Sequence, residues 1–457
     1  MGSGCIIRVV IPASRSRPWR LWAPVAAAIV VVAAVAACGS PAPTPSSPEA
    51  TSTVTPGPTA TPMPTPTPAP VPTATPLASM VAVPTSRLAA PSAPVAHLDA
   101  AKTKALQTAL IGIRSSNKLP GVSAAVLFPD GSIWTGVSGS AVVGKTSVTT
   151  DTLFSVGSIT KTFVAALVGR LAMAGTIGLD DPLSKYVPDF PNAANITLRE
   201  LLNHTSGIDD LFDGNGTIGP ALLYRPTVTW TPAQVFARLL GPRFPKPGSN
   251  YYYSNTNYIL LGLVIEKATA QTVAALVRSE FLTPLGLTHT YLQTEETALG
   301  PKAHGYCTGA GPTCGGDPPT AASPARDNSA GTMFPFTSEA TAVGFAGAYV
   351  STASDLAIWA NALYGGAILD QATLASMVDI SQTAGLKTKP KYPYGMGFEQ
   401  ASVAGQLAWG HRGNLDGFWS TMEYLPAQHV TVVVMANCQW VVDPIPMASI
   451  LAKIAIS

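Results

Sequence analysis

The chain of 457 residues carries little charge for its length. Lysine, arginine, aspartate and glutamate together make up 11% of it, and the formal net charge is +2. Proteins that bind nucleic acid present basic stripes that neutralise phosphates, and acidic interaction tails are runs of carboxylates. The sequence has neither feature, so nucleic acid and other polyanions are poor candidates for partners.

Cysteine is also scarce, with five residues. No cysteine and histidine cluster has the spacing of a metal site, so we expect no metal and no cofactor. Cys307 and Cys314 bracket a Gly/Pro-rich loop, where we expect a local disulfide; two free thiols in a flexible insertion are the alternative. Cys438 follows an apolar run and is expected to be a small buried residue.

The apolar run near the N-terminus is short for a spanning helix. Leu21 to Ala37 contains 17 uncharged residues, interrupted by Pro24, whereas about 20 are needed. Arginines precede the run and "VAAC" ends it, which resembles the lipobox of bacterial lipoproteins. We therefore predict a signal peptide over residues 1–37 and a lipid on Cys38. An uncleaved membrane anchor and a start codon downstream of Met1 stay open.

Residues 38–96 are dominated by proline, threonine, serine and alanine, with "TPMPTPTPAP" at their centre. Such a segment buries too little apolar surface to offset the entropy lost on ordering. We predict an extended tether that anchors a catalytic domain to the membrane and lets it work within a layer of cell wall. Signal and tether together predict an extracytoplasmic location.

Periodic sequence begins at about residue 97 and predicts one folded domain over 97–457. Residues 98–117 have the pattern of an amphipathic helix, with Leu98, Ala101, Leu106, Leu110 and Ile113 near one face. Two strand-like runs follow, joined by a turn at 129–131, and a second strand pair lies at 418–437 before a terminal helix. Strands at both ends predict an α+β fold: an antiparallel sheet flanked by terminal helices, with a mainly helical insertion at about 152–395.

The stretch "SITK" combines a candidate nucleophile with a candidate base. Ser158 begins an apolar helical run, and Lys161 follows at the i+3 position on the same face. The helix macrodipole and burial both lower the pKa of a lysine there, and a neutral lysine can take the proton of a serine. The alternative is a serine cap with a solvated lysine. A second Ser-x-x-Lys at Ser115 lies where a helix runs out, so we expect it to be inert.

Two further motifs strengthen the interpretation of Ser158. Tyr253 and Asn255 form a Tyr-x-Asn directly ahead of an apolar helical run, and His411 and Gly413 form a His-x-Gly before a strand. Taken alone, Tyr253 is an ordinary half-buried aromatic and His411 an ordinary loop histidine. Together the motifs supply a nucleophile with a base, a phenol with an amide, and a polar group beside a glycine.

In this order the motifs resemble the serine penicillin-recognising family of class C β-lactamases, D-alanyl-D-alanine carboxypeptidases and related esterases. The resemblance covers nearly all of the chain from residue 98 onward, and "LLNHTSGI", "PLGLTHTYL" and "AGAYVSTASDLAIWANAL" add to it. It implies the β-lactamase/transpeptidase-like fold, which agrees with the pattern of strands and helices.

The resemblance also implies a role for each motif residue. Ser158 would be the acylated nucleophile, Lys161 its activator and Tyr253 the phenol or phenolate that relays a proton to the leaving group. Asn255 would hold the acyl amide of the substrate, His411 would occupy the position of lysine in the Lys-Thr-Gly version, and Gly413 would let substrate lie along the strand edge. The backbone N–H groups of Ser158 and Asn414 would form the oxyanion hole.

Arg412 departs from the family pattern, which often has threonine between the histidine and the glycine. Directed into the cleft, Arg412 would bind a carboxylate through two hydrogen bonds; directed outward, it leaves carboxylate recognition without a group. Strand alternation places it opposite His411 and Gly413, which favours the outward orientation. No carboxylate in the motifs is an obvious base for deacylation.

We expect an envelope-anchored serine hydrolase that forms an acyl-enzyme on Ser158, with a small molecule or a peptidoglycan peptide as substrate. A D-alanyl-D-alanine carboxypeptidase is the leading form. An extracytoplasmic esterase or a β-lactamase is the first alternative, and a non-catalytic penicillin or peptide sensor is the second. The oligomeric state stays open.

Overall fold

The computed structural model describes residues 99–212, 218–309, 314–329, 333–441 and 443–457. The predicted signal peptide, the lipidation site at Cys38 and the predicted tether lie outside these ranges. Within them, no single helix has the length and apolar composition of a membrane span, although the bent pair Asn255–Thr269 and Val273–Leu285 meets both criteria jointly.

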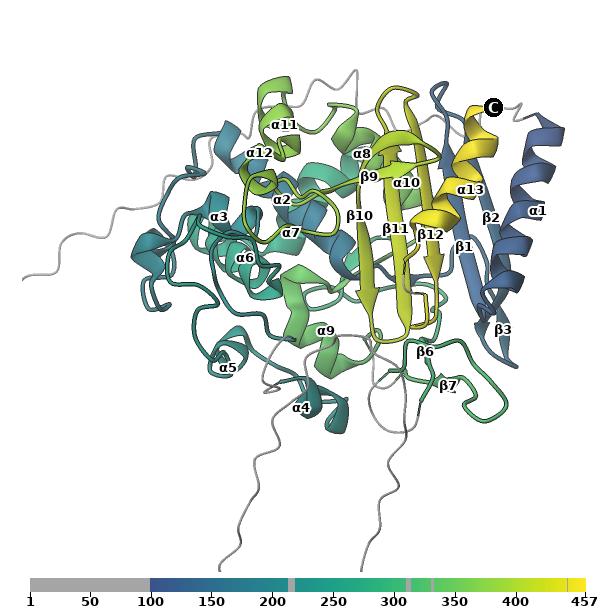
Figure 1. Ribbon diagram of the computed structural model, residues 1–457, viewed down its shortest axis with the longest axis horizontal. Helices are drawn as coiled ribbons and strands as arrows, with labels where there is room; N and C mark the ends of the chain where they lie inside the picture. The colour runs from purple at the N-terminus through teal and green to yellow at the C-terminus, as the bar shows by residue number, and fades with distance from the viewer. Residues whose placement is uncertain (1–98, 213–217, 310–313, 330–332, 442) are drawn as a thin grey trace, which may run out of the picture. The chain divides into compact units, whose positions relative to one another are not determined.

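A seven-stranded antiparallel sheet forms the centre of the domain (Figure 1). Its strand order is β3-β2-β1-β12-β11-β10-β9, so strands from the two ends of the domain meet at the β1–β12 pair. The predicted hairpin β1–β2 and the predicted pair β11–β12 are both present. The strands are β1 Gly121–Leu127, β2 Ile133–Val142, β3 Thr146–Ser147, β9 Glu399–Val403, β10 Gln406–Leu415, β11 Phe418–Leu425 and β12 Val430–Ala436.

Helices cover both faces of this sheet, which explains why its central strands are apolar almost throughout. The terminal helices α1 (Ala100–Ser116) and α13 (Ile445–Ile456) pack side by side on one face. On β1, Val122, Ala124 and Val126 face this pair, whereas Ala125 and Leu127 face the second, larger core. A strand buried on both sides needs apolar residues at every position rather than at alternate ones.

The segment between β3 and β9 is mainly helical, as expected, but it is not separate from the sheet. Helix α10 (Ala353–Tyr364) packs on β1, β11 and β12 and closes the second face. Short strands also form a three-stranded sheet of β4 (Phe154–Ser155), β8 (Tyr349–Ser351) and β5 (Tyr291–Leu292). The remaining helices of the segment between β3 and β9 include α2 Thr160–Met173, α3 Leu198–Leu202, α4 Gly219–Tyr224, α5 Pro232–Phe236, α6 Asn255–Thr269, α7 Val273–Val277, α8 Thr283–Leu285, α9 Thr337–Val343, α11 Gln371–Val378 and α12 Ser381–Ala384.

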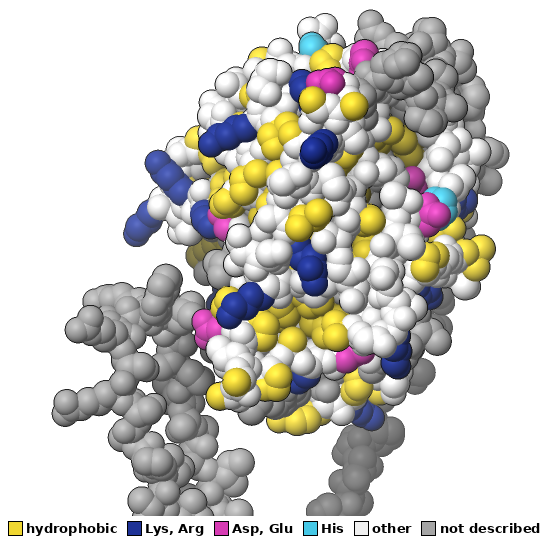
Figure 2. Space-filling view, turned by 90° about the vertical axis from the view of Figure 1, so that its right-hand side faces the viewer, with side chains coloured by type: hydrophobic (Ala, Val, Ile, Leu, Met, Phe, Trp, Pro, Cys, Tyr) yellow, Lys and Arg dark blue, Asp and Glu magenta, His cyan; other side chains and the backbone are white. Residues whose placement is uncertain are grey.

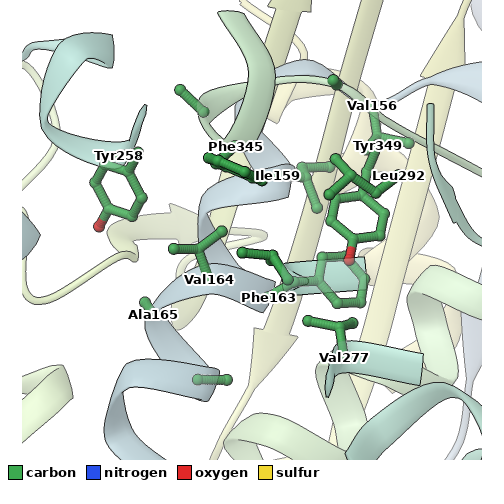
Figure 3. Close-up of a cluster of buried hydrophobic side chains, with 14 of the residues drawn as sticks. Val156, Ile159, Phe163, Val164, Ala165, Tyr258, Val277, Leu292, Phe345 and Tyr349 are labelled. Atoms are coloured by element: carbon green, nitrogen blue, oxygen red, sulfur yellow. The ribbon is translucent and has the colours of Figure 1, made fainter. Parts of the chain in front are cut away.

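Helix α2, the apolar helical run expected after Ser158, is buried on all sides. Every residue from Thr160 to Leu171 is buried, because α2 runs through the middle of the helical region. The Phe163 ring stacks between Tyr349 and Trp359, with centroid distances of 4.7 and 4.2 Å. Figure 3 shows Val156, Ile159 and Phe163 within one apolar cluster. The segment that carries Ser158 is therefore fixed by packing on both sides of the serine.

The first helix differs from its prediction at one residue. Leu106, Leu110 and Ile113 are buried as expected, but Ala101 is exposed in the first turn, and Leu98 lies outside the described residues. The N-cap of α1 is Asp99, whose side chain accepts a hydrogen bond from the Ala101 N–H. Ser115 lies exposed in the last turn, consistent with an ordinary helix end.

The surface and the cysteines agree with two other expectations. On the face shown in Figure 2, which carries α1 and α13, lysine and arginine side chains of the described residues lie scattered rather than in a stripe. A disulfide joins Cys307 to Cys314, next to the two-stranded ribbon of β6 (Tyr306–Cys307) and β7 (Arg326–Asp327). Cys438 is a free, buried thiol, and burial raises its pKa to about 12.

Candidate active site

Ser158 lies in a single 3-10 turn, Gly157–Ile159, at the start of α2, where it faces the strand β10. Gly157 has a φ of +50°, and a Cβ atom there would meet the backbone nitrogen of Asn414 at 2.7 Å. Only glycine tolerates both the left-handed backbone and this approach. The glycine before the serine therefore brings the turn against β10.

Lys161 is fully buried directly beneath Ser158. Its Nζ lies 3.0 Å from Ser158 Oγ, 2.7 Å from Asn255 Oδ1 and 2.9 Å from the Ala346 carbonyl oxygen. The amide and carbonyl oxygens each need an N–H from the amine, so the third position of Nζ is directed at the serine. When the amine is neutral, that position is a lone pair that can accept the Ser158 proton.

The surroundings of Lys161 bring the pKa of its amine close to neutral pH. Burial lowers its pKa to about 7, against the opposing fields of Asp210 and Glu399. Asp210 also orients Asn255, accepting from its backbone N–H at 2.6 Å and from its Nδ2 at 3.3 Å. At neutral pH a large fraction of the amine is thus uncharged and able to act as a base.

Tyr253 completes the group around Ser158. It is hydrogen-bonded to Ser158, and Lys161 Nζ lies 4.8 Å from its ring centroid. Burial raises the pKa of Tyr253 well above 10, which favours the phenol over the phenolate of the two forms expected. The ring of His204 lies 4.2 Å from that of Tyr253, and His204 Nδ1 accepts the Ser254 N–H at 3.1 Å. His204 therefore holds the backbone and the ring in place.

His411 is buried in the wall of the site, on β10. Its Nδ1 lies 2.5 Å from the Arg412 carbonyl oxygen, which can only accept, so Nδ1 carries the proton. Nε2 then accepts from the Tyr394 hydroxyl at 3.0 Å. Burial lowers the pKa of His411 to about 4, with Lys161 acting in the same direction and Glu399 opposing. His411 is therefore a neutral group at neutral pH, unlike the lysine of the Lys-Thr-Gly version.

Packing inside the protein requires glycine at position 413, in addition to the expected access of substrate to the strand edge. A Cβ at this position would lie 1.9 Å from the Val156 carbonyl oxygen and 2.3 Å from Ser420 Oγ. Ser420 Oγ itself donates to that carbonyl at 3.0 Å. The missing side chain thus lets the segment before Ser158 dock on the sheet.

The free edge of β10 faces this group of side chains. β9 pairs with β10 only from Gln406 to Gly410, so within the described residues His411 to Leu415 pair with β11 alone. Asn414 lies at this edge, and its backbone contacts Gly157. The two N–H groups predicted to form the oxyanion hole therefore belong to segments in contact.

Arg412 lies at the cleft, but its guanidinium is already paired with a carboxylate of the protein. Its Nε and Nη2 donate to the carboxylate of Glu399 at 2.7 and 2.8 Å, and its guanidinium carbon lies 3.9 Å from the centroid of the Tyr392 ring. The outward orientation favoured by strand alternation does not keep the guanidinium away from the cleft, because β9 begins at Glu399, opposite Gly410, and places this carboxylate within reach of Arg412. Arg412 therefore lines the cleft, already bound to an internal carboxylate.

An open cleft of about 340 Å³ gives access to these groups. Among the residues that the structure describes, no group of three or more histidine, cysteine, aspartate or glutamate side chains is arranged to hold a metal ion. The residues that line the cleft are Ser158, Tyr251, Tyr253, Pro390, Lys391, Tyr392, Glu399, His411, Arg412, Gly413, Asn414 and Trp419.

Sequence reasoning did not assign roles to four groups that shape the site: His204, Asp210, Tyr394 and Glu399. His204 lies within "LLNHTSGI" and Asp210 two residues after it, so this segment contained a usable signal. Tyr394 and Glu399 had no comparable signal, since they reach the site through the pairing of β9 with β10.

Comparisons with known proteins agree with this geometry. The family model described as Beta-lactamase matches residues 98–444. Unguisins hydrolase ungD of Aspergillus violaceofuscus is 26% identical over 353 residues, which cover 70% of this chain and 58% of that protein. The chain spans between 32% and 58% of the length of the first curated relatives that it matches.

Two solved structures of amide hydrolases are also similar. The D-stereospecific amidohydrolase from Streptomyces sp. is 29% identical with a TM-score of 0.61, over 76% of this chain and 96% of that one. D-amino acid amidase from Ochrobactrum anthropi SV3, solved with L-phenylalanine amide, is 26% identical with a TM-score of 0.65, over 78% of this chain and 98% of that one.

The contact between Gly413 and Val156 predicts the effect of adding one methyl group. In Gly413→Ala, the new Cβ meets the Val156 carbonyl and displaces the segment that carries Ser158. We expect kcat/KM for an activated ester to fall by about 100-fold, the typical effect of a misplacement of about 1 Å. Gly385→Ala is the control, since its Cβ meets no atom within 4 Å. Equal activity of the two variants would contradict this account of Gly413.

The titration of Lys161 predicts the pH dependence of acylation. The amine is a base only when deprotonated, so the rate at which a fluorophosphonate labels Ser158 should rise with pH around a midpoint of about 7. Asp210 raises the pKa of Lys161, so Asp210→Asn should move that midpoint to lower pH. Asp189→Asn, at an exposed position, should leave it unchanged. An upward shift in Asp210→Asn would overturn the assignment of Lys161 as the base.

Proposed function

The chain belongs to the beta-lactamase family of serine hydrolases, and from this premise we propose that it hydrolyses amides of D-configured acyl groups through an acyl-enzyme on Ser158. The observation that carries the proposal is the contact of a buried, largely neutral lysine with a serine hydroxyl at the free edge of a strand. The names of the two similar amide hydrolases support the choice of an amide bond and of D-configuration.

The proposed acylation begins with a proton transfer. Neutral Lys161 takes the proton of Ser158 as Oγ bonds to the carbonyl carbon of the substrate, and the negative oxygen is stabilised by the backbone N–H groups of Ser158 and Asn414. Asn255, bound to Lys161 and Asp210, keeps the role implied by the family resemblance, in which its remaining N–H meets the acyl amide of the substrate.

Collapse of the tetrahedral intermediate then breaks the amide bond. The phenol of Tyr253 gives its proton to the departing nitrogen and regains one from the neighbouring Lys161 ammonium, whose Nζ lies 4.8 Å from the centroid of its ring. Water repeats the sequence on the ester: it loses a proton to the Lys161 and Tyr253 pair, attacks the acyl carbon and releases the acid. Substrate and one water become an acid and an amine, and Ser158 is restored.

A D-alanyl-D-alanine carboxypeptidase is the narrower form of this function. Its substrate ends in a free carboxylate, so that form additionally requires a group in the cleft that binds a carboxylate. An ester can acylate Ser158 by the same steps, with an alcohol as the leaving group. Ester hydrolysis is therefore a second activity that the site supports.

We also propose that this domain works outside the cytoplasm, held by a lipid on Cys38. The lipobox-like "VAAC" and the Pro/Thr-rich segment that follows it support the proposal. In Cys38→Ala, lipid attachment and signal cleavage should both be lost, so membrane fractions should contain unprocessed precursor or the protein should be released. Unchanged processing and unchanged membrane retention would instead indicate a spanning helix.

The acyl-enzyme is tested by intact-mass measurement. The full chain is incubated with a fluorophosphonate and with a labelled penicillin, and one adduct is expected on Ser158. Ser158→Ala should lose both the adduct and the hydrolysis of D-alanine amide, whereas Ser115→Ala should keep both, since Ser115 is an exposed helix-end residue. Full hydrolytic activity in Ser158→Ala would refute the proposed function.

A further inference from the structure

The cations around the candidate active site already have partners. Lys161 Nζ contacts three oxygen atoms below the cleft, and His411 is neutral at physiological pH. Lys391 pairs with Asp443 at 3.0 Å and is 63% exposed, so solvent screens its charge. Arg412 is the remaining cation that lines the cleft. Binding of a substrate carboxylate in the cleft therefore depends on Arg412.

Glu399 occupies the binding edge of Arg412. Two parallel hydrogen bonds of 2.7 and 2.8 Å join the guanidinium to both carboxylate oxygens, and the Arg412 backbone N–H adds a third contact at 3.3 Å. This is the planar, two-point geometry with which arginine binds a carboxylate ligand. Both side chains are largely buried, 17% and 11% exposed. Glu399 thus stands where a substrate carboxylate would bind Arg412.

Other contacts make this pair hard to displace. Tyr392 covers one face of the guanidinium, with its ring centroid 3.9 Å from the guanidinium carbon. The pairing of β9 with β10 holds Glu399 next to Arg412. A free carboxylate ligand would lose translational and rotational freedom on binding there, so it competes poorly with Glu399. The charge and the hydrogen bonds of Arg412 lower the pKa of Glu399 against the effect of burial, so it stays charged.

We propose that Glu399 is a specificity residue: by holding Arg412, it directs the enzyme toward substrates whose leaving group carries no carboxylate, such as primary amides and neutral esters. The inference rests on the proposed function. Within that function it favours hydrolysis of uncharged amides and esters over the carboxypeptidase form. Substrates that end in a free carboxylate meet the charge of Glu399, and both cations among the described residues that line the cleft, Lys391 and Arg412, are already paired with carboxylates.

A matched pair of substrates tests this selection in the wild-type chain. N-acetyl-D-alanyl-D-alanine and its C-terminal amide share the same internal peptide bond and differ in the terminal charge, and only cleavage of that internal bond, seen as release of D-alanine or D-alaninamide, is counted. We expect kcat/KM for the amide to exceed that for the free acid by about tenfold or more, the difference that one charge-assisted contact makes. A wild-type enzyme that prefers the free acid overturns the inference without recourse to any variant.

Variants then identify the residue responsible. In Glu399→Gln the negative charge is lost and Arg412 becomes available, so the acid-to-amide ratio of kcat/KM should rise by about tenfold. The double variant Glu399→Gln with Arg412→Gln should lose that gain. Asp180→Asn is the matched control, because Asp180 binds Arg199 with the same distances of 2.7 and 2.8 Å outside the cleft; its ratio should equal that of wild type.

Fluorophosphonate labelling separates failure of this inference from failure of the proposed function. If Ser158 is labelled in wild type and in Glu399→Gln, yet the acid-to-amide ratio is the same in both, the role of Glu399 is wrong and the function stands. If wild-type Ser158 is not labelled and neither substrate is hydrolysed, the proposed function fails as well.

Discussion

The burial of one amino group is the constraint on which the site depends. A lysine ammonium inside a protein loses its hydration, and Lys161 regains only part of that stabilisation from three oxygen atoms and the distant charge of Asp210. The resulting pKa of about 7 leaves much of the amine neutral at neutral pH. The groups around this nitrogen come from several parts of the chain: the turn at the start of α2, the helix α6 with the loop before it, and the segment before β8.

Close backbone contacts hold these parts together. Gly157 meets Asn414, and Gly413 meets the Val156 carbonyl, so two glycines bring the serine turn and the strand edge into direct contact. Phe163, stacked between Tyr349 and Trp359, fixes the other end of the same segment. The position of Ser158 is thus determined by packing within the protein and needs no ligand to establish it.

The sequence predicted more of the fold than of the electrostatics. The antiparallel sheet, both hairpins and the terminal helices followed from periodicity and turn residues, because these signals are local. The proximity of Ser158, Lys161, Tyr253 and Asn255 followed from the family resemblance. The Glu399 partner of Arg412 did not, because it depends on where β9 ends relative to β10, and strand register is not encoded in one strand alone. The burial of α2 on every side was missed for a similar reason, since its neighbours come from distant segments.

The pairing of β1 with β12 has a consequence for how the enzyme matures. Val122 lies opposite Ala436, so the central sheet joins the first and the last long strands of the domain. A ribosome has released Ser158 and Lys161 long before β10 to β12 exist, and contacts between such distant segments form slowly. In a growing chain the amine of Lys161 therefore stays hydrated and protonated, so it cannot act as a base. The chain becomes a hydrolase only after nearly all of the domain has been made.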